Sequence, residues 1–418
     1  MIHATPARFQ SVHDATDAAP VPSLHIAASP ASGLGAVVII PVKDEAENLP
    51  LTLAALAAQV DLAGQPLPAG SFEVIVLANN CLDQSAAVAR RFAQAHPALT
   101  IHVAEILLPA PLAHIGWARR LLMDEACRRL ELAGATTGYI ASTDGDTQVA
   151  PTWLAATRAE LTTYQTAAVC GRILTPEACQ PSRVRRCQLR DAAYRLLSAR
   201  LEAALDPNAA DPWPRHHQHF GASFAITVAA YRLVGGLPVV PYLEDEALFQ
   251  ALLRHDLSVR HSPAVRVSTS DRQEGRVAVG LSWQLREWAT LGTRQHEPLV
   301  AGVPSLVAAH TLRRQLRQLW QSAHVADVVA ESLATRQALV ESLAFSLSIS
   351  TVTLALHLRH AASFGALWEW VEQGPMRKAA WSRRWQPVPL TQALHELRQL
   401  LSKPVAELNY TFSSTSSR

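Results

Sequence analysis

The sequence predicts an α/β fold in which helices wrap a sheet of buried strands, followed by a region made only of helices. Two observations predict the sheet. Short apolar runs alternate with helical patterns up to about residue 275, and polar turns follow the runs. A third predicts the helical region, because the chain from about 281 to 405 is nearly all helical in pattern. We therefore expect a disordered tail, an α/β domain, a helical accessory region and a second disordered tail at 1–33, 34–280, 281–405 and 406–418.

The first half of the α/β domain repeats one cycle of strand and helix. Its first strand is GAVVIIPV, a β-branched run that ends with proline, as is typical of a buried parallel strand. In the next segment, DEAENLPLTLAALAAQV, Leu49, Leu53, Leu56 and Val60 recur at helical spacing. The runs FEVIVLA, LTIHVAEIL and GYIAST are further strands, with helical patterns between them. This alternation of strands and helices predicts a parallel sheet.

The second half of the domain is less regular. TWLAATRAELTTYQ is helical in pattern, AAVCGRIL is a strand, and residues 182–205 form a long helix rich in arginine. LEDEALFQALLRHD is a helix because Leu248/Leu252 and Phe249/Leu253 make an i,i+4 face. LSVRHSPAVRVSTS is the last strand of the domain.

Composition excludes several classes of protein. The chain has 418 residues with 37 Lys+Arg against 35 Asp+Glu, a balance that argues against a dedicated nucleic-acid binder. The five cysteines form no CxxC pair, so we expect reduced thiols and a cytoplasmic protein. The first twenty residues lack the apolar core of a signal peptide. The most apolar run, residues 343–358, is shorter than the ~20 residues that cross a bilayer, so we expect a buried helix and no membrane span.

Two acids end the predicted strand GYIAST, in the string ASTDGDTQVAP. Asp144 and Asp146 are two residues apart, so in extended chain both side chains point to one face. In parallel sheets, ligands bind beyond the carboxyl ends of the strands. Two carboxylates there suit Mg²⁺ or Mn²⁺ with a diphosphate as the remaining partner. The alternative is an acidic turn without a ligand.

Five strings between about residues 35 and 275 resemble the motifs of one family, in the same order. They are IIPVKDEAENLPLTLAAL, VIVLANNCLDQSAAVA, ASTDGDTQVAP, GASFAITVAAYRLVGGLP and LEDEALFQALLR. Together they resemble glycosyltransferase family 2, the inverting enzymes with a GT-A fold. The resemblance implies a Rossmann-like mixed sheet flanked by helices and a hexosyltransferase that uses a nucleotide-diphosphate sugar. It also implies Mg²⁺ or Mn²⁺ as the cofactor.

The resemblance also implies roles for the donor side of the site. Asp144 and Asp146 would hold the divalent ion and the nucleotide sugar, with Asp146 favoured as the direct metal ligand. Pro41, Glu45 and Asn79 match positions that contact the nucleotide. Asn79 stands where the family commonly has Asp, and its amide can still hydrogen-bond the edge of a base.

Further roles follow for catalysis. Asp245 matches the catalytic base that deprotonates the acceptor hydroxyl, with Glu244 as the second candidate. An acidic first turn that stabilises a helix is compatible with this role. Arg119 is a candidate contact of the diphosphate, and the alternative for it is a solvated helical face.

The string WPRHHQHFGAS precedes the acceptor-side motif. Trp213, His219, Gly221 and Ala222 are the candidate acceptor-binding residues, since Trp offers a stacking surface for a sugar ring. The histidines of this string lack the spacing of a zinc site. We expect an unidentified small-molecule or glycan acceptor.

Two other functions compete with glycosyl transfer. A nucleotidylyltransferase would carry a Gly-rich, basic loop after its first strand, but PVKDEAEN has one lysine and no glycine. A catalytically silent protein that binds sugar nucleotides is the other alternative, and the retained Asp144, Asp146 and Asp245 argue against it.

Overall fold

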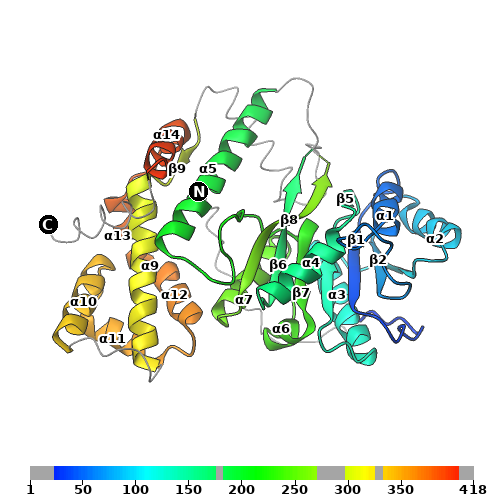
Figure 1. The fold of residues 1–418 in the computed structure, drawn as a ribbon, viewed down its shortest axis with the longest axis horizontal. Coiled ribbons are helices and arrows are strands. Elements are labelled where there is room, and N and C mark those ends of the chain that lie inside the picture. Colours follow the sequence, from blue (N-terminus) through cyan, green and yellow to red (C-terminus); the bar gives the residue numbers. More distant parts are fainter. Residues whose placement is uncertain (1–22, 176–181, 271–296, 325–332, 404–418) are drawn as a thin grey trace.

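The computed structural model describes residues 23–175, 182–270, 297–324 and 333–403. In Figure 1 the strands and their helices occupy the centre and right of the molecule, and the helices from α9 onward occupy the left. Most of the predicted first tail and all of the second, at 1–22 and 406–418, lie outside the described residues, as does the predicted domain boundary near 280.

The large sheet has eight strands in the order β3-β2-β1-β4-β7-β6-β8-β5. The strands are β1 (Ala36–Val42), β2 (Phe72–Asn79), β3 (Ile101–Ile106), β4 (Tyr139–Ser142), β5 (Thr147–Val149), β6 (Ala168–Leu174), β7 (Phe224–Thr227) and β8 (Val259–Thr269). The first four are parallel, whereas β7 runs antiparallel to β4 and β6, and β5 antiparallel to β8. The sheet is therefore mixed, as the family resemblance implies, and not wholly parallel as strand–helix alternation alone predicts.

Helices cover both faces of this sheet. They are α1 (Leu49–Ala57), α2 (Ser85–Ala95), α3 (Ile115–Leu132), α4 (Trp153–Thr163), α6 (Val228–Leu233) and α7 (Glu244–Arg254). Val37 and Ile39 of β1 pack with residues of α3, α6 and α7, whereas Val38 and Ile40 pack with α1, α2 and α4. Successive side chains of a strand point to opposite faces, so one apolar run supplies both halves of the core. The predicted α/β class is confirmed.

Residues 23–33 correct the prediction of a free tail over this part of the chain. The Ile26 amide donates a hydrogen bond to Glu125 Oε1 at 3.0 Å, and Arg129 Nη1 donates to the Ala28 carbonyl at 2.6 Å. Leu24 and Ile26 also pack against the core under α3. The segment is ordered because buried charges of α3 bond its backbone, which composition does not reveal.

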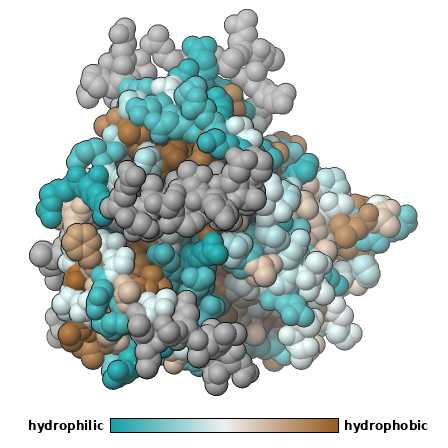
Figure 2. Space-filling model, turned by 60° about the vertical axis from the view of Figure 1, so that its left-hand side comes forward, coloured by the Kyte–Doolittle hydropathy of each residue, from teal (hydrophilic) through white to brown (hydrophobic). Residues whose placement is uncertain are grey.

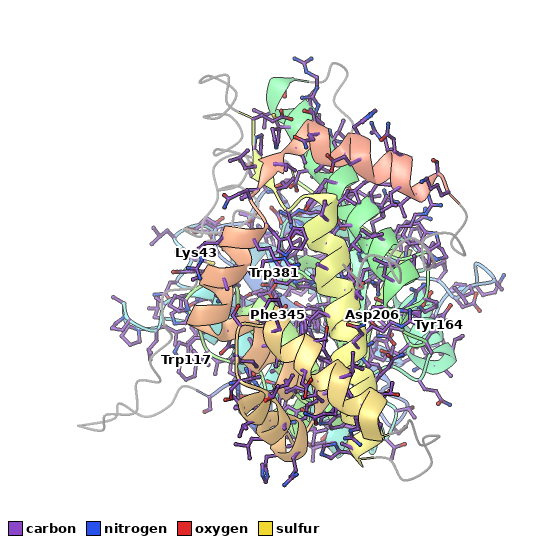
Figure 3. The ribbon with its side chains drawn as sticks, turned by 90° about the vertical axis from the view of Figure 1, so that its left-hand side faces the viewer. Lys43, Trp117, Tyr164, Asp206, Phe345 and Trp381 are labelled. Atoms are coloured by element: carbon purple, nitrogen blue, oxygen red, sulfur yellow. The ribbon has the colours of Figure 1, made fainter. Side chains whose placement is uncertain are left out.

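The helical region predicted after residue 281 is present. It contains α9 (Val303–His324), α10 (Leu333–Ser346), α11 (Thr351–His360), α12 (Phe364–Gln373), α13 (Pro375–Arg384) and α14 (Leu390–Leu401). Strands β9 (Leu299–Val300) and β10 (Val388–Pro389) form a small antiparallel pair. The Arg-rich helix α5 (Arg183–Leu205) packs against α14 and α9 of this region through a shared apolar cluster. Figure 3 shows Asp206, just after α5, beside α9.

The apolar run 343–358 is two helices instead of the single buried helix that we expect. Ser348 has a φ of 55°, and the Ser350 side chain caps α11 by accepting from the Thr353 amide at 3.0 Å. The two helices meet at 108°, and only together do they have the length and apolar composition of a membrane span. No single helix among the described residues does. Figure 2 shows small, separate hydrophobic patches on this side of the molecule, and Phe345 of α10 is 82% exposed.

Candidate active site

The candidate site lies where the strand order reverses. From β1 the chain proceeds outward to β2 and β3, and β4 then pairs with the other edge of β1. Polar residues that follow β1 and β4 therefore meet at the switch point, where open α/β sheets bind ligands. A side chain on Gly145 would stand 3.1 Å from Glu45 Cγ, so the turn after β4 lies directly on the segment after β1.

The turn after β1 is held to the turn after β2. Asp44 has a φ of 53°, and its carboxylate accepts from the Leu82 amide at 2.6 Å, while Asp83 accepts from the Ala46 amide at 2.9 Å. The left-handed backbone at Asp44 does not continue into a helix, and α1 begins at Leu49 with a proline in its first turn. Burial raises the pKa of Asp44, but the amide bonds and Lys43 outweigh it and lower the pKa overall.

The same turn contains a group of three side chains with closely spaced ligand atoms. Those of Asp44, Cys81 and Asp83 lie within 4.8 Å of one another, and no other group of three His, Cys, Asp or Glu in the described chain is so close. Lys43 forms an ion pair with Asp44 at 3.2 Å, and both carboxylates accept backbone amides. These bonds hold the two acids in place between the turns after β1 and β2.

Three predicted donor-binding residues lie at the ends of β1 and β2. Pro41 is buried in β1, and the Glu45 carboxylate accepts from the Asn48 side chain at 3.0 Å. Asn79 ends β2 and is 7% exposed, and its Oδ1 atom has no hydrogen-bond partner. A buried amide oxygen without a partner costs free energy, which a ligand with an N–H group would recover.

Asp144 and Asp146 have different surroundings although they are two residues apart. Asp144 is paired with Arg119 at 3.1 Å, and its side chain is 37% exposed. Asp146 accepts from the Ser270 hydroxyl at 2.8 Å, at the end of β8. Burial, with the nearby charge of Asp146, raises the pKa of Asp144 against the opposing effect of Arg119.

Arg119 connects the two acidic motifs. It is 4% exposed and donates through Nη2 to Asp144 at 3.1 Å and through Nε to Glu244 Oε1 at 2.9 Å. Its Nη1 donates to the Gly221 carbonyl at 3.1 Å and to the Ser142 hydroxyl. The solvated helical face is therefore wrong, because the guanidinium is buried among these acceptors.

Asp245 is the second residue of α7, a helix that begins directly after Leu243, whose φ is 59°. Its Oδ2 atom accepts from the Gly221 amide at 2.8 Å, and its Oδ1 atom accepts from the Glu246 amide at the same distance. Glu244 is buried against Arg119, and this burial raises the pKa of Glu244. The two carboxylates therefore differ: Glu244 lies in the interior and Asp245 is half-buried.

The candidate acceptor side lies next to Asp245. His219 Nε2 is 2.6 Å from Glu246 Oε2, and the His219 ring stacks on Phe249 with centroids 4.0 Å apart. Gly221 and Ala222 are buried in the short helical turn before β7. Trp213 is 43% exposed, and the Arg200 guanidinium lies 5.9 Å from its ring centre.

Sequence reasoning missed three contributors to this site. Ser270 bonds Asp146, and Glu246 bonds His219. Buried Asp211 lies 2.8 Å from His261, a residue of β8 whose ring meets that of His219 edge-on. Glu246 could have been found, because it directly follows Asp245. Asp211 and Ser270 carry no signal, since each meets its partner through the tertiary fold.

The geometry thus brings Asp144, Glu244, Asp245 and Gly221 around Arg119. Residues 37–214 match the family model described as Glycosyl transferase family 2. This segment belongs to glycosyltransferase family 2. The mixed, helix-flanked sheet is the GT-A architecture that the resemblance implies.

Solved structures of glycosyltransferases are similar to the chain at low identity. The mannosyltransferase PcManGT from Pyrobaculum calidifontis, in complex with GDP-Man and Mn²⁺, is 18% identical, and the match covers 82% of this chain and 85% of that one with a TM-score of 0.41. TarS 1–349 from S. aureus, in complex with UDP, is 13% identical over 84% and 91% of the two chains, with a TM-score of 0.40. Glucosyl-3-phosphoglycerate synthase from Mycobacterium tuberculosis is 16% identical over 67% and 80%, with a TM-score of 0.35. No curated protein matches the sequence.

Proposed function

We propose that the protein is a metal-dependent, inverting glycosyltransferase. It moves a sugar from a nucleotide-diphosphate sugar to a hydroxyl group of a small-molecule or glycan acceptor. The observation that carries the proposal is that the buried Arg119 bonds Asp144, Gly221 and Glu244. Asp245 accepts a hydrogen bond from the amide of the same Gly221. Membership of residues 37–214 in the family supports it.

The donor binds over the ends of β1, β2 and β4. Pro41 and Glu45 border the nucleotide, and the unpartnered Asn79 oxygen accepts an N–H of the base. Asp144 and Asp146 lie beside the diphosphate. The turn at Gly145 packs tightly on Glu45, since a Cβ atom at Gly145 would lie 3.1 Å from Glu45 Cγ.

The acid pair fits a divalent metal ion by its chemistry. Asp146 and the partly exposed Asp144 supply carboxylate oxygens, which Mg²⁺ and Mn²⁺ prefer. When bound, the ion neutralises charge on the leaving diphosphate. Arg119 offsets part of the negative charge of the pair before an ion binds.

Asp245 is the catalytic base in this proposal. It is half-buried, and the Gly221 and Glu246 amides orient its carboxylate. It accepts the proton of the acceptor hydroxyl as that oxygen attacks the anomeric carbon. Glu244 is less suited to this role, because it is committed to Arg119 in the interior. Gly221 and Ala222 border the acceptor. His219, which lies beside Glu246, hydrogen-bonds the acceptor. Trp213, which is 43% exposed, offers a stacking surface at the edge of the acceptor site.

The test is turnover of a panel of UDP-, GDP- and TDP-sugars with Mn²⁺ by wild type and two variants. Candidate donors come first from a thermal-shift screen, because a ligand specific for the native state raises the melting temperature. Asp146→Ala and Asp245→Asn should each abolish turnover, and Asp245→Asn should still bind the nucleotide. Unchanged turnover in either variant would sink the assignment.

The same assay separates the alternatives. A silent sugar-nucleotide binder would show thermal shifts without transfer or hydrolysis of the donor in wild type. A nucleotidylyltransferase would instead release pyrophosphate from a nucleoside triphosphate and a sugar phosphate.

A further inference from the structure

We propose that Arg119 is a positioning residue that holds the donor side and the acceptor side of the site in one fixed geometry. The inference rests on the proposed function, which supplies the roles of Asp144 and Asp245. It replaces the expectation that Arg119 contacts the diphosphate directly.

The guanidinium of Arg119 uses each of its nitrogen atoms on a different part of the fold. Nη2 reaches Asp144 after β4, Nε reaches Glu244 at the start of α7, and Nη1 reaches the Gly221 carbonyl before β7. The planar guanidinium holds several acceptors in a defined relative orientation, which a lysine ammonium does not. One side chain of α3 thus fixes three segments that are far apart in sequence.

Gly221 transmits this geometry to Asp245. Its carbonyl accepts from Arg119, and its amide donates to Asp245 Oδ2 at 2.8 Å. Glu244, the neighbour of Asp245, bonds Arg119 from the other side. Movement of the guanidinium would therefore displace the Asp245 carboxylate at both its backbone and its hydrogen-bond partner.

Burial and packing argue that Arg119 stays in this position. It is 4% exposed, and its charge is paired with Asp144 at 3.1 Å and with Glu244 at 2.9 Å. A Cβ atom on Gly221 would lie 2.5 Å from the central carbon of the guanidinium, so a larger residue there would displace the guanidinium. The neighbouring Arg120 differs: it bonds Asp124 and the carbonyls of Gly235 and Leu237, away from the acids.

The first experiment compares Arg119→Gln with Arg119→Lys and with the matched control Arg120→Gln. Donor affinity is measured by calorimetry with nucleotide and Mn²⁺, and transfer by steady-state kinetics. We expect Arg119→Gln to lower kcat about 100-fold, because a misplacement of about 1 Å costs this much. The donor Kd should weaken by much less than kcat falls, since Arg119 orients Asp144 but does not itself bind the donor. Arg119→Lys should restore only part of kcat, and Arg120→Gln should leave it unchanged.

Two kinetic results would overturn the proposal. If Arg119→Gln weakens donor binding about 100-fold and keeps the wild-type kcat, Arg119 is a diphosphate contact and not a positioning residue. Full activity in Arg119→Lys would mean that only the positive charge matters and not the planar geometry of the guanidinium.

A second variant moves the guanidinium without removing it. Gly221→Ala should lower kcat with little change in donor Kd, whereas Gly33→Ala, which has open space around it, should have no effect. Wild-type kinetics in Gly221→Ala would contradict the proposal.

Hydrogen exchange provides a readout that does not depend on turnover. In Arg119→Gln, peptides that cover 219–223 and 243–247 should exchange faster than in wild type, with α9 unchanged. If wild type turns over no donor, the proposed function fails, and exchange still decides whether Arg119 holds these segments. Unchanged exchange in both peptides would overturn the positioning role.

Discussion

Glu73 shows how one buried charge orders a distant part of the chain. It lies in β2, where its carboxylate accepts from Arg129 Nη2 at 2.7 Å and lies 3.3 Å from His102. Burial raises the pKa of Glu73, but the bonds to Arg129 and His102 outweigh it and lower the pKa overall. Arg129 in turn bonds the Ala28 carbonyl, so the pair anchors the segment before β1. An acid in an otherwise apolar strand is tolerated because its partners are buried with it.

Replacing Glu73 should therefore be costly. In Glu73→Ala the buried Arg129 loses its counter-ion, and we expect a loss of about 3–5 kcal/mol in the free energy of unfolding. Urea unfolding measures it. The control is Glu131→Ala, which breaks the exposed ion pair with Arg232 and should cost no more than about 1 kcal/mol. Equal losses in the two variants would contradict this account of Glu73.

At the scale of elements, the loop before β7 is built around a neutral histidine. His216 Nδ1 accepts from the Gln218 amide at 3.1 Å, and Nε2 lies 3.1 Å from the Ser262 carbonyl of β8. These bonds require one protonated and one unprotonated ring nitrogen. Burial, with the nearby His261, lowers the pKa of His216 to about 3.

This geometry predicts that mild acid destabilises the protein. His216 takes up a proton near pH 6.5 when unfolded but only near pH 3 when folded, so its contribution to stability is complete above pH 6.5 and is lost as the pH falls below it. From pH 8.0 to pH 5.5 the loss is about 1.4 kcal/mol for this group. Unfolding free energies at the two pH values test it in wild type and in His216→Gln. His216→Gln should be less stable than wild type at pH 8.0, but its free energy of unfolding should fall by about 1.4 kcal/mol less between pH 8.0 and pH 5.5. The same pH dependence in both proteins would refute the assignment to His216.

At the scale of the whole molecule, an ionic cluster joins the sheet domain to the C-terminal helices. Asp206, which follows α5, accepts from Arg313 at 2.5 Å and from Arg317 at 3.0 Å, both on α9. Glu202 bonds Arg313 and also Arg215 of the loop before β7. Burial raises the pKa of Glu202, but Arg313 and Arg215 outweigh it and lower it to about 2.

Breaking this cluster should loosen the attachment of the helical region. In Asp206→Ala two arginines of α9 lose a buried partner, with an expected cost of about 3 kcal/mol. Calorimetry should show a lower melting temperature, and hydrogen exchange should increase in α9. Asp191→Ala, which breaks a more exposed pair with Arg195 on the same helix, is the control and should shift stability by less than about 1 kcal/mol. If the two variants melt alike, Asp206 does not contribute to the attachment of α9 to α5.

The sequence by itself determined the features that depend on neighbouring residues. Apolar runs such as GAVVIIPV and GYIAST are strands, and the i,i+4 face of Leu248 and Leu252 marks a helix, because both patterns follow from local backbone periodicity. It also placed Asn79, Asp144 and Asp146 at strand ends. The carboxyl ends of adjacent parallel strands meet at one edge, so their shared location was predictable.

Only the tertiary structure decided which partners these residues meet. The antiparallel direction of β7 and the pairing of β5 with β8 depend on contacts between strands distant in sequence. Arg119 lies 25 residues from Asp144 and 125 from Glu244 along the chain, and no local pattern distinguishes it from Arg120. Its role follows from burial, because a guanidinium removed from water must find acceptors, and the fold sets which acceptors those are.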